Sequence, residues 1–204
     1  MHDMRNTARL VGVCSLVGGA AWTAACFVHN SLPQGCIDAE CDGHAMRGSS
    51  PVATALFVVA GLMLAGAGVG LLLLARERNG GLGRAAVAAG VCGALGLLLL
   101  GSAAVVSAVD NDWNGMPGLV VPGVLLLAAG LVLLAVAVIR ARVVPVWCSA
   151  LLLASALVLP FANEQTSRIL LAVPFGVCWA LLGVVVLRRP AAVQREAHAG
   201  AGTM

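Results

Sequence analysis

The chain has 204 residues, of which 60% are hydrophobic and only 10% are charged. Soluble globular domains carry about 25% charged residues, so this chain has too little charge to cover a folded soluble surface. The composition therefore predicts an integral membrane protein. The net charge of +3 is too small and too dispersed to predict nucleic-acid binding.

Six apolar runs follow one another along the chain, and none contains Asp, Glu, Lys or Arg. They cover residues 10–29, 51–75, 85–108, 119–139, 143–160 and 169–187. Each is about 18–25 residues long, which is enough for a helix to cross roughly 30 Å of hydrocarbon. The runs do not alternate between apolar and polar residues as membrane β-barrel strands do. The sequence therefore predicts an all-α, polytopic six-helix transmembrane bundle.

Arginine is distributed unevenly among the segments that join these runs. Ten arginines lie in four segments, residues 1–9, 76–84, 140–142 and 188–204. The alternate segments contain two, Arg47 and Arg168, and six acidic residues. Cytoplasmic loops of membrane proteins are rich in basic residues. The distribution therefore predicts a multi-pass protein of the bacterial cytoplasmic membrane with both termini in the cytoplasm.

The choice of residue types is also distinctive. The chain has no lysine and no tyrosine, its twelve basic residues are all Arg, and Ala, Gly, Leu and Val dominate. This composition is typical of GC-rich bacterial genomes, and the chain resembles the small six-span integral membrane proteins of actinobacteria. The resemblance is one of composition and length over the whole chain, rests on no motif, and implies no activity.

The runs show a weak internal periodicity. Each odd-numbered run has a cysteine shortly after its basic segment, namely Cys14, Cys92 and Cys148, and each even-numbered run ends in aliphatic residues followed by Arg. This pattern predicts three tandem antiparallel hairpins, although convergence on the same interface chemistry gives the same pattern. Residues 1–189 then form one transmembrane domain, and residues 190–204 are predicted to be a disordered cytoplasmic tail.

Small residues and prolines within the runs predict how the helices pack. Gly66 and Gly70 in the second run, and three glycines within residues 90–96 in the third, are spaced for close contact between helices. Pro122 and Pro174 lie near the outer ends of the fourth and sixth runs, where proline can kink a helix. Such kinks would open a small outward-facing crevice.

The apolar runs lack the groups that membrane catalysis and coupled transport normally use. No ionisable carboxylate, His, Lys or Arg lies deep within a run. Proton-coupled transporters normally keep such a group within a span, and intramembrane acid–base catalysis also needs one. Retinal binding needs a lysine, which is absent. We therefore expect a protein that is not an enzyme and that has no cofactor.

Residues 30–50 contain the most polar chemistry. Cys36 and Cys41 are close enough to form a disulfide in an oxidising compartment, which would stabilise the fold by about 2 kcal/mol. The same thiols with His29 and His44 form a weak candidate site for Zn²⁺ or Cu(I), although their spacing matches no strong zinc pattern. A redox-active pair is a third alternative, but redox motifs favour Cys-x-x-Cys.

Residues 110–115 read Asp-Asn-Asp-Trp-Asn-Gly and match the first half of an EF-hand calcium loop. Asp110, Asp112 and Asn114 would be the ligands. The twelfth position, which supplies a bidentate Glu in an EF-hand, is Val121. Any metal site here would therefore be weak, and a polar turn explains the same residues.

Residues 161–168 contain the second arginine of the acid-rich segments. Asn163 is predicted to cap the sixth helix, and Glu164 and Arg168 are predicted to pair because they are four residues apart. A second hypothesis places Trp113, Glu164 and Arg168 in an outer polar site that contacts an anion or a lipid head group.

We predict a non-enzymatic membrane component that acts through helix contacts and its outer loops, with the lipid bilayer and a membrane protein as partners. One alternative is a small permease or resistance-type transporter for an apolar or lipid-like solute. Another is an outer-face membrane protein that binds metal or uses thiols, centred on Cys36 and Cys41.

Overall fold

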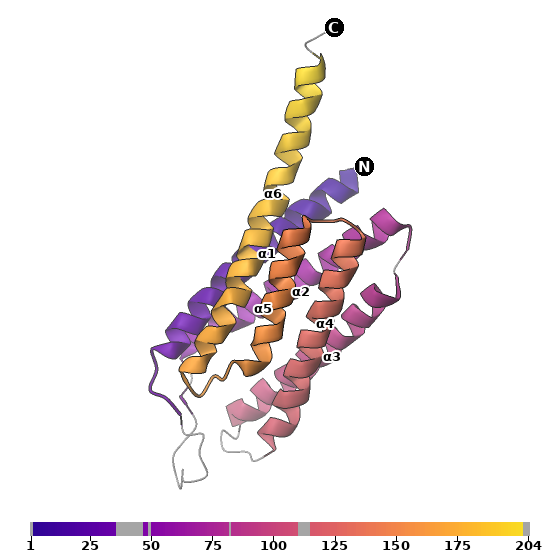
Figure 1. The fold of residues 1–204 in the computed structure, drawn as a ribbon. Helices are drawn as coiled ribbons and strands as arrows, with labels where there is room; N and C mark the ends of the chain where they lie inside the picture. Colours follow the sequence, from indigo (N-terminus) through magenta and orange to yellow (C-terminus); the bar gives the residue numbers. More distant parts are fainter. Residues whose placement is uncertain (1, 36–46, 49, 82, 110–114, 202–204) are drawn as a thin grey trace.

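The computed structural model describes residues 2–35, 47–48, 50–81, 83–109 and 115–201, and all regular structure in them is helical (Figure 1). The elements are α1 (His2–Asn30), α2 (Pro51–Asn79), α3 (Arg84–Val109), α4 (Met116–Arg140), α5 (Val146–Val158), η1 (Leu159–Phe161), η2 (Ser167–Ala172) and α6 (Val173–Ala201). The prediction of an all-α fold is confirmed. The two η elements are short 3₁₀ helices that continue α5 and precede α6.

Five of the helices in the described part of the chain are long and apolar enough to cross a membrane. The fifth apolar run is shorter, because α5 and η1 together cover only Val146–Phe161. A span of this length reaches about 26 Å, against roughly 30 Å for the hydrocarbon of a bilayer. The fold therefore fits a multi-pass membrane protein, with α5 as the short member of the bundle.

The ends of α2 follow from its local sequence. Pro51 begins the helix directly after Ser50, where its missing N–H removes no hydrogen bond. At the other end, Gly80 adopts a left-handed conformation with φ of 69°. The Gly81 N–H then donates to the Arg76 carbonyl at 3.1 Å. This Gly-rich C-cap lets the chain reverse within a few residues into α3.

The helices run between two ends of the bundle, which we call proximal and distal. The proximal end has the start of α1, the extension of α6 and the reversals from α2 to α3 and from α4 to α5. The distal end has the ends of α1 and α3, the starts of α2 and α4, and the α5–α6 connection (Figure 1). Ten of the twelve arginines belong to segments at the proximal end or to the extension of α6 beyond it. Arg47 and Arg168 belong to distal segments. The bundle thus separates arginine by end, as the sequence pattern predicts.

The helices do not pack as the three equal hairpins that the sequence predicts. α1 packs along α2, and α3 packs along α4, as predicted for the first two hairpins. α6, however, packs mainly along α1, while α5 contacts α4 more than it contacts α6. The third predicted hairpin is therefore not a closely packed pair, because α5 packs mainly on α4 and α6 packs mainly on α1. α3 has few contacts with α2 and forms one flank of the bundle (Figure 1).

Glycine pairs hold α1 against α6. Gly12 faces Gly183, and Gly19 faces Gly176, so that each helix supplies two glycines seven residues apart. A Cβ on Gly183 would lie 2.6 Å from the Gly12 carbonyl oxygen and 2.5 Å from the Leu16 amide nitrogen. Because backbone atoms occupy these places, no flexible side chain can move away. Only glycine allows this close approach, which is typical of helix packing in lipid.

We call this line of close glycine contacts a seam. A similar seam joins α3 and α4. A Cβ on Gly96 would lie 2.9 Å from the Gly123 carbonyl oxygen, and one on Gly130 would lie 2.8 Å from the Gly93 amide nitrogen. The predicted contact role of the glycines in residues 90–96 is thus confirmed for Gly93 and Gly96. Gly61 of α2, by contrast, faces open space, since a Cβ at this position would have no described atom within 4 Å.

Aromatic side chains fill the region between α1, α2 and α6 toward the distal end. Trp22 packs edge-to-face against Phe57 and Phe175, with ring centroids 5.4 and 5.3 Å apart. Phe175 in turn contacts Trp179 at 6.1 Å. Such edge-to-face pairs stabilise a core beyond the burial of their area. The Trp22 indole N–H donates to the Ala172 carbonyl at 2.9 Å, whereas the buried Trp179 N–H has no partner in the described structure.

Two further features differ from the sequence prediction. Pro174 is the second residue of α6, where proline fits without kinking, and η2 precedes it. Pro122 does lie inside α4. The helix α6 also continues to Ala201, past the apolar run, where the sequence predicts a disordered tail. Residues 190–201 contain five alanines, which favour a helix, together with Pro190, which disfavours one.

Candidate functional site

The distal end is organised around the side chain of Arg47, which is only 6% exposed. Its guanidinium donates five hydrogen bonds, two to the α5–α6 connection and three to the chain that leaves α1. The acceptors are the backbone carbonyl oxygens of Asn30, Leu32, Pro33, Glu164 and Thr166, at donor–acceptor distances of 2.6–3.2 Å. These segments are more than a hundred residues apart in the sequence. Arg47 therefore ties the chain that leaves α1 to the connection that precedes α6.

The five bonds use the whole hydrogen-bonding capacity of the guanidinium, which has five N–H groups and no acceptor. No carboxylate among the described residues forms an ion pair with Arg47. Its charge is instead surrounded by carbonyl dipoles, which satisfy a buried cation without neutralising it. A saturated guanidinium has no donor left for a ligand. Arg47 is thus a structural clamp and not an anion site.

Gln165 adds a second layer to this clamp. Its side-chain oxygen accepts from the Arg47 backbone N–H at 2.6 Å, and its carbonyl accepts from the Gly35 N–H at 3.0 Å. His29 at the end of α1 contacts the Glu164 carbonyl with its Nε2 at 3.2 Å. The described parts of the α1–α2 and α5–α6 connections therefore form one hydrogen-bonded unit, which we call the distal cap: residues 29–35, Arg47 and residues 163–166.

The capping residue before α6 differs from the prediction. Thr166 precedes η2 and accepts from the Arg168 N–H at 3.2 Å through its hydroxyl oxygen. Asn163 accepts instead from the Gln165 N–H at 2.8 Å, which closes a turn within the connection. The prediction that Asn163 caps the sixth helix is wrong, because the helical chain resumes only at Ser167, beyond the reach of the Asn163 side chain.

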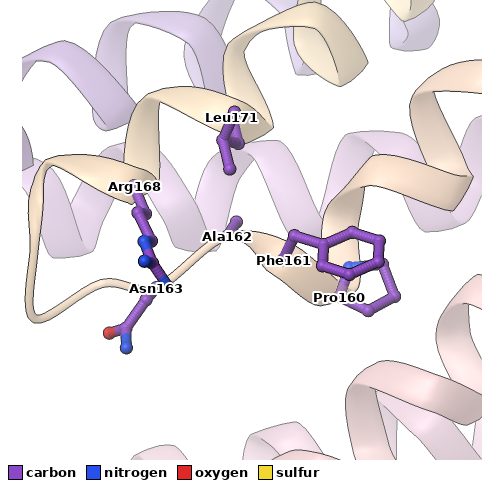
Figure 2. Close-up of a pocket in the computed structure, with 6 residues that line it drawn as sticks. All are labelled: Pro160, Phe161, Ala162, Asn163, Arg168 and Leu171. Atoms are coloured by element: carbon purple, nitrogen blue, oxygen red, sulfur yellow. The ribbon is translucent and has the colours of Figure 1, made fainter.

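A depression of about 380 Å³ lies beside the distal cap, between the end of η1 and the start of η2. Figure 2 shows that Arg168 and Asn163 lie together on one side of it and that Phe161 and Pro160 lie on the other. Ala162 and Leu171 complete the lining. The depression thus combines one cationic and one amide side chain with an apolar wall.

A second, shallower feature is an apolar groove of about 420 Å³ along the outside of the α1–α6 seam. Its described lining includes Leu16, Phe27 and Leu181, and Thr23 supplies the one polar side chain in that lining. The Thr23 hydroxyl donates to the Gly19 carbonyl at 2.9 Å, as is usual for threonine within a helix. The groove is therefore an apolar surface suited to lipid, and its hydroxyl donor is already used within α1.

The structure describes three of the site residues that the sequence singles out. His29 belongs to the distal cap, Arg168 lines the depression, and Glu164 is exposed beside it. Glu164 and Arg168 do not form the predicted ion pair, because Glu164 lies in a turn before the helix and the regular i,i+4 geometry is absent. Among the described residues, no three His, Cys, Asp or Glu side chains are grouped for a metal ion.

The remaining candidates lie outside the described residues: Cys36, Cys41, His44, Asp110, Asp112, Trp113 and Asn114. The disulfide, the thiol or metal site and the calcium turn therefore stay predictions. Cys26, near the distal end of α1, is fully buried. Its burial favours a packing role for that thiol.

The sequence pattern does not point to the roles of Arg47 and Gln165. Arg47 stands out in the sequence only as an exception to the charge rule, although a single arginine among several acidic residues is a signal of an unusual environment. Gln165 has no signal in the sequence, because its role depends on a backbone N–H that is 118 residues away. No family model matches the chain, and no curated protein or solved structure matches it.

Proposed function

We propose that the chain is a six-span protein of a bacterial cytoplasmic membrane, with both termini in the cytoplasm, and that it acts without catalysis by binding a membrane-protein partner. The apolar helices and the separation of arginine by end support the membrane orientation. In this orientation the distal cap and the depression face the outside. The resemblance of the chain in composition and length to actinobacterial membrane proteins supports the assignment to a bacterial membrane.

The observation that carries this proposal is the construction of the distal end. A buried arginine that binds five backbone carbonyls gives the distal cap a fixed shape, which is what a recognition surface needs. The flank of the bundle offers a second surface. Val91, Leu98 and Val105 of α3 are exposed at intervals of seven residues, so they lie along one face of that helix.

Reporter fusions test the orientation and the number of spans. A phosphatase that folds only outside the cytoplasm and a fluorescent protein that folds only inside are fused after Arg142, after Asn163 and after Met204. We expect the fusions after Arg142 and Met204 to be cytoplasmic and the fusion after Asn163 to be external. Opposite locations for the fusions after Arg142 and after Asn163 would show that the short α5 crosses the membrane. A phosphatase-active fusion after Met204 would contradict the proposed orientation.

Photo-crosslinking tests the partner. A crosslinking amino acid at Leu98, which is exposed, is compared with one at Leu71, which is fully buried. We expect a discrete crosslinked protein from Leu98 and none from Leu71, with solute uptake unchanged when the protein is deleted. Crosslinks to lipid alone, together with a loss of solute tolerance on deletion, would favour the permease alternative.

A further inference from the structure

The two arginines at the distal end differ in how their guanidinium groups are hydrogen-bonded. All five N–H groups of Arg47 are bound to carbonyl oxygens. The Arg168 side chain is exposed and has no hydrogen-bond or ion-pair partner in the described part of the chain. Its backbone N–H is used by Thr166, which fixes the position of the residue without using the guanidinium. Arg168 is therefore the distal cation that remains available for a ligand.

The lining of the depression beside Arg168 is amphiphilic. The Phe161 side chain is 70% exposed and the Leu171 side chain is 41% exposed, although both are large and apolar. Arg168 and Asn163 form the opposite side (Figure 2). The Asn163 side-chain oxygen is already used by the Gln165 N–H, so its amide group has its two N–H donors left. The polar side of the depression therefore offers donors to an anion, and the apolar side offers a surface to a hydrocarbon chain.

The depression also lies where such a ligand would be found. It is placed between the end of the apolar stretch Val146–Phe161 and the start of the apolar stretch Ser167–Arg188. The ends of membrane-spanning stretches lie at the level of the lipid phosphates, and arginine side chains there extend toward them. Guanidinium groups bind phosphate through two parallel hydrogen bonds, more strongly than neutral donors do.

We propose that the depression lined by Arg168, Asn163 and Phe161 binds an anionic phospholipid of the outer leaflet. The guanidinium of Arg168 and the amide of Asn163 hold the phosphate, and Phe161, Pro160 and Leu171 contact the beginning of an acyl chain. The site rests on the proposed membrane residence of the chain. It differs from the site predicted from the sequence, because Glu164 does not line the depression.

Lipid titration followed by native mass spectrometry tests the site. The full chain is stripped of lipid in detergent and titrated with phosphatidylglycerol. We expect Arg168→Gln to weaken binding about tenfold and Phe161→Ala about threefold, as expected for the loss of a charged hydrogen bond and of an apolar contact. Arg188→Gln, the same charge change at an exposed proximal arginine, serves as the control and should leave binding unchanged. An equal effect of Arg168→Gln and Arg188→Gln would overturn the site.

Three further measurements distinguish a lipid phosphate from a free phosphate, and the lipid site from the proposed membrane residence. Inorganic phosphate at millimolar concentration should not displace the lipid, and displacement would show a site for a free anion instead. Arg168→Lys keeps the charge but not the paired donors, and should bind with intermediate strength. Release of the protein by carbonate washing would overturn both membrane residence and the lipid site. Retention in the membrane with unchanged lipid binding in Arg168→Gln would overturn the lipid site alone.

Discussion

Arg47 shows how one side chain determines the shape of the distal end. Its guanidinium replaces the water that five backbone carbonyls would otherwise need, and it brings together segments near both ends of the chain. Lysine cannot do this, because it has three donors on a single nitrogen instead of a planar fork of five. Burial makes the arrangement demanding, since the Arg47 guanidinium is only 6% exposed and depends on these carbonyls for its hydrogen bonds.

Removal of this clamp should destabilise the protein strongly. We expect Arg47→Ala to lower the free energy of unfolding by about 3 kcal/mol, because several carbonyls lose their donor at once. Arg47→Lys should cost about half as much. The midpoint of thermal unfolding in detergent measures both effects, with Arg188→Ala as the exposed control. Identical midpoints for Arg47→Ala and the control would show that the clamp contributes nothing to stability.

Two serines of α5 provide a matched test of buried hydroxyl groups. The Ser155 hydroxyl donates to the Leu152 carbonyl at 2.9 Å. The Ser149 hydroxyl is fully buried and has no partner in the described structure. A hydrogen bond contributes about 1 kcal/mol, and a buried hydroxyl without one is unfavourable. We therefore expect Ser155→Ala to destabilise the protein by about 1 kcal/mol and Ser149→Ala to leave stability unchanged or raise it.

The same unfolding measurement in detergent decides between these serines. A clear loss of stability in Ser149→Ala would mean that its hydroxyl has a partner after all, such as a bound water. Equal losses for the two variants would contradict the distinction drawn between them.

At the scale of helices, the glycine seam between α1 and α6 should tolerate no side chain. A Cβ at residue 183 would meet backbone atoms of Gly12 and Leu16, so Gly183→Ala must push the two helices apart. We expect a cost of about 2 kcal/mol, in the range of overpacked cores. Gly61→Ala is the control, because it faces open space and alanine favours a helix. Thermal unfolding of the two variants measures the difference, and an equal response would contradict the seam.

The helical character of the apolar runs could be predicted from the sequence, although α1 begins earlier and α6 ends later than the runs do. An apolar run in lipid forms a helix because only a helix satisfies its own backbone groups, so that run lengths nearly determine helix positions. The seams could not be predicted in the same way. Gly12 and Gly19 are two among 25 glycines, and their spacing with Gly176 and Gly183 becomes meaningful only when α1 and α6 are known to be neighbours.

The candidate site could be predicted only in part, because local sequence patterns identify a residue but not its long-range partners. Arg168 stands out in the sequence because it breaks the charge rule, and it does line the distal depression. The partners predicted for it were wrong in part, since Glu164 forms no ion pair with it. Local spacing predicts such pairs only within a regular helix, and residues 162–166 form an irregular turn. Long-range contacts, such as those of Arg47, have no local pattern at all.

At the scale of the whole molecule, the helices form two groups. α2 and α6 both pack along α1, and α3 and α4 form the other group. α5 connects the two groups through contacts with α4 and α6, and α2 has smaller contacts with α4. The chain therefore crosses between groups twice, once at the α2–α3 turn and once along α5. In lipid, each helix is stable by itself and association is a separate step, so a break in the turn between groups should be tolerated.

A chain divided in the Gly80–Gly83 turn tests this architecture. One fragment then contains α1 and α2, and the other contains α3 to α6. The α1–α6 seam is the largest contact that joins them, and the bonds of Arg47 to Glu164 and Thr166 add to it. We expect the two co-expressed fragments to purify together through a tag on either one. Gly19→Ile should reduce this association at least tenfold, because a large side chain at the seam meets the backbone of α6 at Gly176 and Ala180. Gly61→Ile adds the same side chain to α2 at an open position and should leave association unchanged. Equal association of the two variants would mean that contacts other than the α1–α6 seam hold the two fragments together.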